Sequence, residues 1–379
     1  MAKSIVSIIK STPSTVLEDV ARALRDAGSR EILDRSADVC LKINVTWHLY
    51  MPGTSTTPWQ LEGVVRTLLE DGFRADQLWG VHNDTVVVDS RVGEVNNKQK
   101  PVCDAYGVRC VYLNDPDQEW VDYEPDPEFL VLHKVYEKTG IRIPKHLIGK
   151  NIVHLPTVKT HVFTTITGAM KNAFGGLLHF QRHWTHSVIH ETLVDLLRIQ
   201  KKIHPGVFAV TDGVFCGDGP GPRAIRPHVK GYFLASADQV AIDAVSARMM
   251  GFDPLSIKFI RLAHEAKLGV GDVRDIEVRG EDLSKINFHF KGNEETFASR
   301  GQKAIYHGPL KPLEKVLLQS PLVPWSYAAS RLFHDVYWYP AHGRKRVGKV
   351  LEENEWGRLF RDYEQGLAAR GAAGKGRET

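Results

Sequence analysis

Lysine, histidine and glycine residues gather in one stretch of the sequence, at spacings typical of a site that binds an anion. Lys159 and His161 follow an apolar run, and Lys171 lies ten residues after His161 in a glycine-rich segment. Lysine ammonium groups attract a carboxylate or phosphate, and glycines let backbone N–H groups approach it closely. We expect a loop at residues 167–176 to hold an anionic ligand or cofactor; a solvated glycine turn is the alternative. The residues expected to contact the bound group are Lys159, Gly168, Lys171, Asn172 and Gly175.

Four histidines follow at spacings of four, three and four residues: His179, His183, His186 and His190. On a continuous helix they would share one face. Imidazoles on one face bind zinc, nickel or iron, or relay protons near neutral pH. We expect His183, His186 and His190 to hold a transition metal if one is present. Histidines that cap a helix, pack or face solvent are the alternative.

Three residues elsewhere in the sequence are candidates for the same site. Asn44 and His82 lie at the ends of two apolar runs, and Asp212 follows a third. Together with His161, His82 is a candidate acid or base, and Asp212 is a candidate general base or metal ligand on a flexible rim. Asn44 would contact the bound cofactor or ligand. A structural role for His82 and a turn role for Asp212 are the alternatives.

The elements that must position these residues follow an α/β pattern. Short apolar runs alternate with helix-like segments, which favours mostly parallel sheets with sites at the carboxyl ends of strands. The expected strands are residues 5–9, 39–45, 77–81, 151–155, 206–210 and 232–235. The expected helices begin after Thr15 and at Pro58, and cover Ser187 to Lys202, Gln239 to Met250 after an Asp238 cap, and Pro254 to Lys267.

The length of 379 residues allows more than one domain. We expect a first α/β lobe at residues 1–145, a second α/β lobe with the main motifs at 146–300, and a helical, aromatic and basic extension at 301–379. The site would lie in the cleft between the lobes. We expect the aromatic stretch Val316 to Trp338 to pack on the core; contact with a membrane or with a partner, as in a homo-oligomer, is the alternative.

Composition excludes several classes of protein. The net charge of +4 is too small to indicate a nucleic-acid partner. Four cysteines without a C-x-x-C pair predict neither a disulfide framework nor an iron–sulfur cluster. The sequence contains no apolar run long enough for a transmembrane segment, and its N-terminus does not have the pattern of a signal peptide. These features predict a cytoplasmic protein with reduced thiols.

The motifs together resemble the domain of unknown function 362 family, over roughly Leu41 to Val278. Many members of that family also carry a ferredoxin-like module, whose cysteine runs this sequence lacks. The motifs that carry the resemblance are Lys42-x-Asn44, Thr56-Thr57-Pro58, Leu155-Pro156-x-x-Lys159-Thr160-His161, Thr167-Gly168-Ala169-x-Lys171-Asn172-x-Phe174-Gly175, Asp212-Gly213, Gly217-Asp218-Gly219-Pro220 and Asp238-x-x-Ala241-x-Asp243.

The spacing of His161 and Lys171 is also distantly similar to that in lactate racemase. In that family the lysine anchors a nickel-pincer cofactor, a downstream histidine binds nickel, and other histidines move protons at a 2-hydroxy acid. The resemblance implies Lys171 as the anchor of a Lys-linked organic cofactor, His183 or His186 as the nickel ligand, and His161 with His82 as the acid/base pair. The racemase's Asp-x-Thr-Arg-Pro loop is replaced here by Asn44-Val45-Thr46-Trp47, which lacks the arginine.

The sequence therefore predicts an enzyme that acts on a small anionic metabolite by proton or hydride movement at carbon, as an isomerase or epimerase does. Two other classes stay open. The histidine row fits a metal-dependent redox enzyme or metal-handling protein, and the glycine segment fits a protein that binds an anionic ligand without catalysis.

Overall fold

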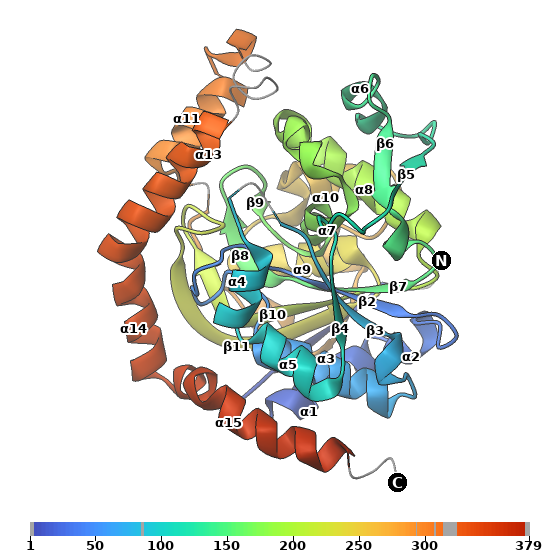
Figure 1. The fold of residues 1–379 in the computed structure, drawn as a ribbon, viewed down its shortest axis with the longest axis vertical. Helices are drawn as coiled ribbons and strands as arrows, with labels where there is room; N and C mark the ends of the chain where they lie inside the picture. The colour runs from blue at the N-terminus through green and yellow to red at the C-terminus, as the bar shows by residue number, and fades with distance from the viewer. Residues whose placement is uncertain (1–3, 85–86, 293, 307, 314–323, 376–379) are drawn as a thin grey trace.

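The computed structural model describes residues 4–84, 87–292, 294–306, 308–313 and 324–375, and a large sheet organises them (Figure 1). The strands are β1 (Ile5–Lys10), β2 (Val39–Ile43), β3 (Leu78–His82), β4 (Arg109–Tyr112), β5 (Trp120–Tyr123), β6 (Ile141–Pro144), β7 (Asn151–Leu155), β8 (Thr157–His161), β9 (Thr165–Ile166), β10 (Val207–Asp218), β11 (Arg226–Ser236) and β12 (Glu277–Gly280).

The large sheet has the strand order β12-β1-β11-β10-β7-β2-β3-β4, with β8 paired to β10 and β9 to β8. Most neighbouring strands are parallel; the antiparallel pairs in this sheet are β1–β11, β10–β11 and β8–β9. Strands β5 and β6 form a separate antiparallel pair. The predicted α/β class with a mostly parallel sheet is confirmed.

The helices start where local sequence signals favour them. Thr57 caps the helix that begins at Pro58, and its Oγ1 accepts the N–H of Gln60 at 3.3 Å. Asp238 caps the helix that begins at Gln239 in the same way, as predicted. The helices are α1 (Val16–Asp26), α2 (Ser29–Ile32), α3 (Pro58–Glu70), α4 (Ser90–Asn96), α5 (Gln99–Tyr106), α6 (Leu132–Val135), α7 (Ala169–Leu177), η3 (Phe180–Val188), α8 (Ile189–Ile203), α9 (Gln239–Met250), α10 (Lys258–Glu265), α11 (Phe297–Tyr306), α13 (Pro324–Arg331), η8 (Leu332–Gly343), α14 (Arg344–Glu353) and α15 (Glu355–Lys375).

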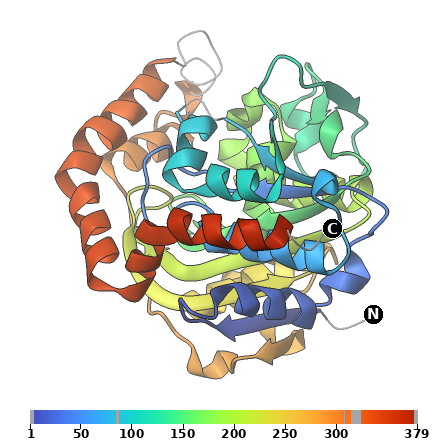
Figure 2. The ribbon, with the colours of Figure 1, turned by 60° about the horizontal axis from the view of Figure 1, so that its bottom comes forward.

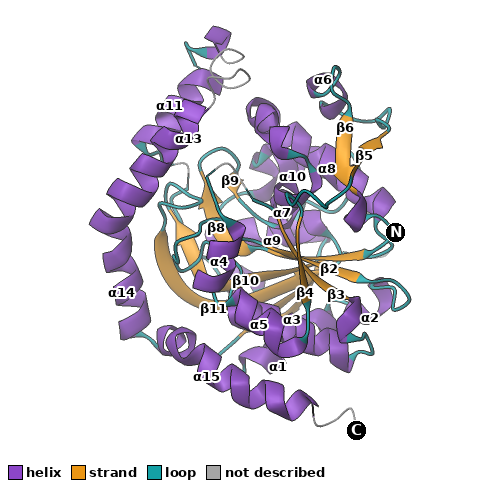
Figure 3. Ribbon diagram, in the orientation of Figure 1, coloured by secondary structure: helices purple, strands orange, loops and turns teal. Residues whose placement is uncertain are grey.

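Each face of the sheet carries its own hydrophobic core. Alternate residues of a strand point to opposite faces, so Val39 and Leu41 of β2 enter one core and Cys40 enters the other. Helices α1, α3, α5 and α15 pack on the first face, and α7, α8, α9 and α10 pack on the second (Figure 3). Both faces are covered, as expected for parallel strands made almost entirely of apolar residues.

The two predicted lobes, residues 1–145 and 146–300, share one sheet. Strands from residues 1–145 and from 146–300 are hydrogen-bonded neighbours in one sheet: β7 pairs with β2, and β1 pairs with β11 and β12. The apolar strand pattern is the same for one shared sheet as for two sheets, so the sequence pattern did not distinguish them. The site therefore lies at an edge of one sheet and not in a cleft between two sheets.

The C-terminal strap, residues 324–375, wraps around the body as a chain of helices (Figures 1 and 2). Trp356, Phe360 and Tyr363 pack around the buried Trp59 of α3, with ring centroids 5.4 to 6.3 Å apart. The predicted helical extension is confirmed, and its last helix packs on the core. Residues 316–323 of the predicted aromatic stretch lie outside the described residues. A homo-oligomer formed through this extension stays a prediction.

Among the described residues, none of the helices has both the length and the hydrophobicity needed to span a bilayer.

Candidate functional site

A cavity of about 490 Å³ lies at the carboxyl ends of β7, β2 and β3, and its lining extends into the segments that follow these strands. This is the edge at which α/β sheets hold ligands, and the volume suits a small metabolite. Helix α11 and the strap contribute further walls through Tyr306, Ser330 and His334.

Most of the residues predicted from the sequence line this one cavity. They are Asn44, His82, Lys159, His161, Gly168, Lys171, Asn172, Gly175, His183 and His186. Asp212 and His190 are described by the structure but do not belong to the lining. Residues more than a hundred positions apart in the chain are thus brought together because β2, β3 and β7 are neighbours in the sheet.

Five cationic side chains line the cavity, whereas a single carboxylate, that of Asp84, does so among the described residues. The cations are Lys42, Lys159, Lys171, Arg182 and Arg223. Three of them are almost fully buried: Lys42 is 4% exposed, Lys159 2% and Arg182 7%. Buried charges in proteins are normally paired with an opposite charge. The structure leaves this set with an excess of positive charge.

Backbone carbonyl and hydroxyl oxygens, rather than carboxylates, accept hydrogen bonds from these cations. Lys42 Nζ donates to the carbonyl of its neighbour Ile43 at 2.7 Å. Lys159 Nζ donates to the Thr54 carbonyl at 2.8 Å and to Thr157 Oγ1 at 2.7 Å.

The remaining three cations also have few partners among the described residues. Arg182 Nη2 donates to the Asp84 carbonyl, and Arg223 Nη2 donates to Ser330 Oγ at 3.0 Å. The Nη1 atom of each arginine is buried without a hydrogen-bond partner among the described residues. Lys171 Nζ lies 5.5 Å from the ring centroid of Phe174 and has no salt bridge among those residues.

Burial in this positive environment lowers the pKa values of the three lysines. Burial, followed by repulsion from Arg182, lowers the pKa of Lys42 to about 7 and that of Lys171 to about 8. Burial, followed by repulsion from Lys171, lowers the pKa of Lys159 well below its usual value. A bound anion would favour the charged form of each lysine.

His161 is held in one orientation that makes it a hydrogen-bond donor. Its Nδ1 accepts the backbone N–H groups of Phe163 at 3.1 Å and Thr164 at 3.4 Å. The proton of the neutral ring must then lie on Nε2. Burial and the nearby Lys171 also lower the pKa of His161 well below its usual value. The ring therefore offers an N–H group and disfavours the imidazolium form.

The predicted glycine loop at 167–176 is instead a two-residue connection, 167–168, followed by helix α7. Gly168 precedes this helix, and the first two helical N–H groups, of Ala169 and Met170, donate to the Asp243 carboxylate at 2.6 and 3.0 Å. The helix N-terminus is thus capped by the protein's own carboxylate rather than left for a ligand. Asp243 of α9 therefore has a structural role at the start of α7.

Two glycines of this segment provide space for charged side chains. A Cβ at Gly168 would lie 2.3 Å from Asp243 Oδ1, and a Cβ at Gly176 would lie 2.7 Å from Lys42 Cε. The close approach of Gly176 lets the Lys42 side chain pass α7 toward the cavity.

The four histidines do not lie on one α-helix, because His179 precedes the helical segment and α8 begins only at Ile189. His183 and His186 belong to the 3₁₀-helix η3 and His190 to α8. His179 packs against Trp120 and His190 stacks on Phe259. The metal-ligating atoms of His183, His186 and His190 do not form one of the close groups found among the described residues. His183 and His186 still line the cavity.

Asp212 was predicted on a flexible rim but lies inside strand β10, fully buried. Its carboxylate accepts hydrogen bonds from Thr57 Oγ1, from Trp59 Nε1 at 3.0 Å and from the Val214 N–H at 2.6 Å. These contacts join β10 to the start of α3. Its position in the structure gives Asp212 a structural role.

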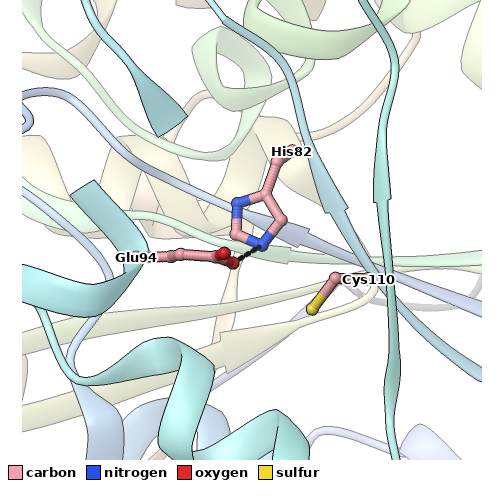
Figure 4. A group of neighbouring side chains, drawn as sticks. All are labelled: His82, Glu94 and Cys110. Atoms are coloured by element: carbon pink, nitrogen blue, oxygen red, sulfur yellow. Dashed lines mark ion pairs between the residues drawn. The ribbon is translucent and has the colours of Figure 1, made fainter. Parts of the chain in front are cut away.

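His82 lies at the end of β3 beside a carboxylate and a thiol, and it also lines the cavity (Figure 4). Its Nε2 lies 3.1 Å from Glu94 Oε2. Burial opposes protonation of His82, but contacts with Cys110 and Glu94 outweigh burial and raise its pKa. Contact with Cys103 and with His82 lowers the pKa of the Cys110 thiol.

The sequence interpretation missed several residues of the site: Lys42, Arg182 and Arg223 as cations, and Glu94 and Cys110 beside His82. A signal existed for Lys42, since it is the one charged residue in the apolar strand β2. Lysine in a fully covered strand is rare unless it has a function. The other residues become part of the site through tertiary contacts that no local pattern records.

A family model described as a domain of unknown function (DUF362) matches residues 39–248, which is more than half of the chain. The chain therefore belongs to this family, as the motifs predicted. The matched region supplies most of the cavity lining, including Lys42, Lys159, Lys171 and Arg182.

A thylakoid-associated protein of Synechocystis sp. is 29% identical to the chain over 138 residues. The match covers 34% of this chain and 41% of that protein, so the chain matches less than half the length of this relative.

We predict that Gly168→Ala destabilises the protein more than a glycine substitution with open space around it. Gly168 has φ +95° and a Cβ there would meet Asp243, whereas Gly149 has φ +74° and no atom within 4 Å of where a Cβ would lie. Backbone strain alone should lower the free energy of unfolding of Gly149→Ala by about 1–2 kcal/mol. Gly168→Ala should lose at least about 1 kcal/mol more, since the cap must also shift. Urea unfolding of both variants measures the difference; equal losses would contradict the role of the Asp243 cap.

Proposed function

We propose that the protein is an enzyme that binds a small, multiply charged anion in this cavity and moves a proton at one of its carbon atoms, as an isomerase or epimerase does. The observation that carries the proposal is that, in the described part of the chain, five cations and one carboxylate line the cavity. Removing these charges from water costs free energy when the protein folds. A bound anion with carboxylate or phosphate groups would offset that cost.

The acid/base roles follow from the hydrogen bonds and the pKa values. In the free protein Lys171 has a pKa of about 8, so it reaches the neutral form that takes a proton more readily than an exposed lysine does, and its charged form returns the proton. His161 would donate its Nε2–H to an oxygen of the substrate and so stabilise the charge that develops when a neighbouring carbon loses a proton. Lys42, Lys159 and Arg182 would hold the anionic groups. The Asn172 amide is bonded within the protein, since its Nδ2 donates to the Lys42 carbonyl at 2.8 Å.

An aromatic wall suits the uncharged part of such a substrate. Phe163, His186 and Tyr306 contact one another with ring centroids about 6 Å apart, and all three line the cavity. Tyr306 comes from α11, outside the region matched by the family model. Substrate choice would therefore depend partly on the extension.

A bound cofactor, a redox reaction and the location of the protein in the cell are separate from the anion site. The Lys-linked nickel cofactor implied by the lactate racemase resemblance stays a prediction, as do a redox reaction and a cytoplasmic location. The name of the cyanobacterial relative refers to thylakoids, and attachment of this chain to a membrane would be a separate proposal. Binding of an anion without catalysis is the second candidate, since the cation set alone supports it.

Anion affinity should fall as pH rises through the range 7–9. In the free protein Lys42 and Lys171 lose their protons at about pH 7 and 8. A bound anion favours the charged forms and raises both pKa values, so binding takes up protons and is strongest below pH 7. Above pH 7 for Lys42, and above pH 8 for Lys171, affinity should fall by up to about tenfold per pH unit for each lysine. Calorimetric titration, with the tightest anion from a panel of carboxylates and phosphate esters, measures the slope.

The slope of log affinity against pH equals the number of protons taken up on binding. Lys171→Met should reduce it by about one, and Lys201→Met, which removes an exposed lysine of α8, should leave it unchanged. An affinity that does not depend on pH, or an equal slope in both variants, would contradict the anion site.

Proton movement at carbon is tested by exchange in D₂O. The protein should exchange a C–H proton of a bound substrate for deuterium, detected by NMR of the substrate. Lys171→Ala and His161→Ala should each slow the exchange by about 10²–10⁴-fold while the protein stays folded, since a positioned acid or base supplies that much. Folded variants that exchange at the full rate would contradict the roles given to Lys171 and His161. Anions that bind tightly and never exchange would favour binding without catalysis.

A further inference from the structure

The group His82, Glu94 and Cys110 brings three kinds of metal-ligating atom together outside the cation set. His82 ends β3, Cys110 lies in the neighbouring strand β4, and Glu94 lies in α4. The ring nitrogen, carboxylate oxygen and sulfur all lie within 4.8 Å of one another (Figure 4). Within the described residues, it is the one group of three or more His, Cys, Asp or Glu side chains whose ligand atoms are close enough to bind the same ion.

The sheet places these donors on rigid elements. Strands β3 and β4 are parallel, with Gly80 opposite Cys110 and His82 opposite Tyr112. Side chains two residues apart share a face, so Cys110 lies on the same face as His82. Gly80 has no side chain between them; a Cβ there would lie 3.4 Å from Cys110 Sγ.

Three polar atoms of His82 and Glu94 are buried and lack hydrogen-bond partners among the described residues. His82 is 1% exposed and Glu94 is 3% exposed. Both ring nitrogens of His82 and the Oε2 of Glu94 have no hydrogen-bond partner among the described residues. Nε2 and Oε2 lie 3.1 Å apart, but their alignment is not that of a hydrogen bond. Buried polar atoms without a partner are rare, and an ion bound between them would satisfy both.

The surroundings resemble the supporting shell of a metal site. The Tyr112 hydroxyl donates to Glu94 Oε1, which fixes the carboxylate and leaves Oε2 toward His82. The Tyr112 ring also stacks on His82, with centroids 5.3 Å apart. Groups that orient metal ligands in this way commonly tune the affinity of a site.

We propose that His82, Glu94 and Cys110 bind a zinc ion at the edge of the cavity. Imidazole nitrogen, carboxylate oxygen and thiolate sulfur are the donors that zinc prefers. Bond lengths of about 2.0–2.3 Å place tetrahedral donors about 3.3–3.8 Å apart, so the three side chains need to move by no more than about 1 Å. Three protein ligands leave a fourth position for water or a bound molecule. His82 then acts as a metal ligand, and the site does not depend on the proposed isomerase chemistry.

Cobalt(II) is the probe, because a cobalt–thiolate bond gives a charge-transfer absorption band in the near ultraviolet. Protein made without a histidine tag and stripped with a chelator should bind one cobalt ion per chain with this band, and zinc should remove it. Cys110→Ser should lose the band. Cys103→Ala, which removes the neighbouring thiol outside the group, should keep it. Circular dichroism establishes that each variant is folded.

Two further variants separate a metal site from an ion pair. Glu94→Gln should weaken cobalt binding by at least about tenfold, and Tyr112→Phe, which removes the hydroxyl that holds Glu94, by about tenfold. The proposal is overturned if folded wild-type protein binds no cobalt with a thiolate band, or if the band survives in folded Cys110→Ser. The absorption band reports metal binding alone. A failure of the metal-site proposal can therefore be told apart from a failure of anion binding or turnover.

Discussion

The excess of buried positive charge at the carboxyl ends of β7, β2 and β3 is the interaction on which the rest of the site depends. Moving an ammonium or guanidinium group out of water is unfavourable unless an opposite charge compensates it. Here the compensation comes from the carbonyls of Ile43, Thr54 and Asp84, which are dipoles and not charges. A bound anion would complete the electrostatics of this region, and the lowered lysine pKa values express the same imbalance in the free protein.

The fold maintains this imbalance by fixing the segments that surround the charges. Asp243 caps α7 and thereby sets the start of the helix that carries Lys171, while Asp212 ties β10 to α3. The strap closes another side: Trp47 Nε1 donates to Asp335 at 2.7 Å, and Ser330 accepts from Arg223. The carboxylates of Asp212 and Asp243 are thus used in structural contacts, and Asp84 is the one carboxylate of the described residues that lines the cavity.

Much of the site's location could be predicted from the sequence, because strand ends in an α/β protein converge. Asn44, His82, Lys159 and His161 each lie at or near the end of an apolar run, and all line the cavity. The glycine segment was harder, since Gly175 and Gly176 fit both a loop and a helix that must pass Lys42 closely.

Other parts of the site depend on tertiary contacts that have no local signature. Regular spacing of the four histidines suggested one helix, but the chain there is a 3₁₀-helix followed by α8. Pairing of β3 with β4, not sequence proximity, brings Cys110 to His82. The shared sheet likewise depends on pairings such as β1 with β11, between residues more than two hundred positions apart.

The central claim is that lysines are buried in this cavity without a compensating charge, and NMR titration of ¹³C-labelled lysine side chains tests it most directly. Signals are assigned with Lys42→Met and Lys171→Met. The account predicts titration midpoints of about 7 for Lys42 and about 8 for Lys171 in the free protein, both moving upward when a multiply charged anion binds. Midpoints of both lysines near the ordinary value of about 10.4 in the free protein would contradict it.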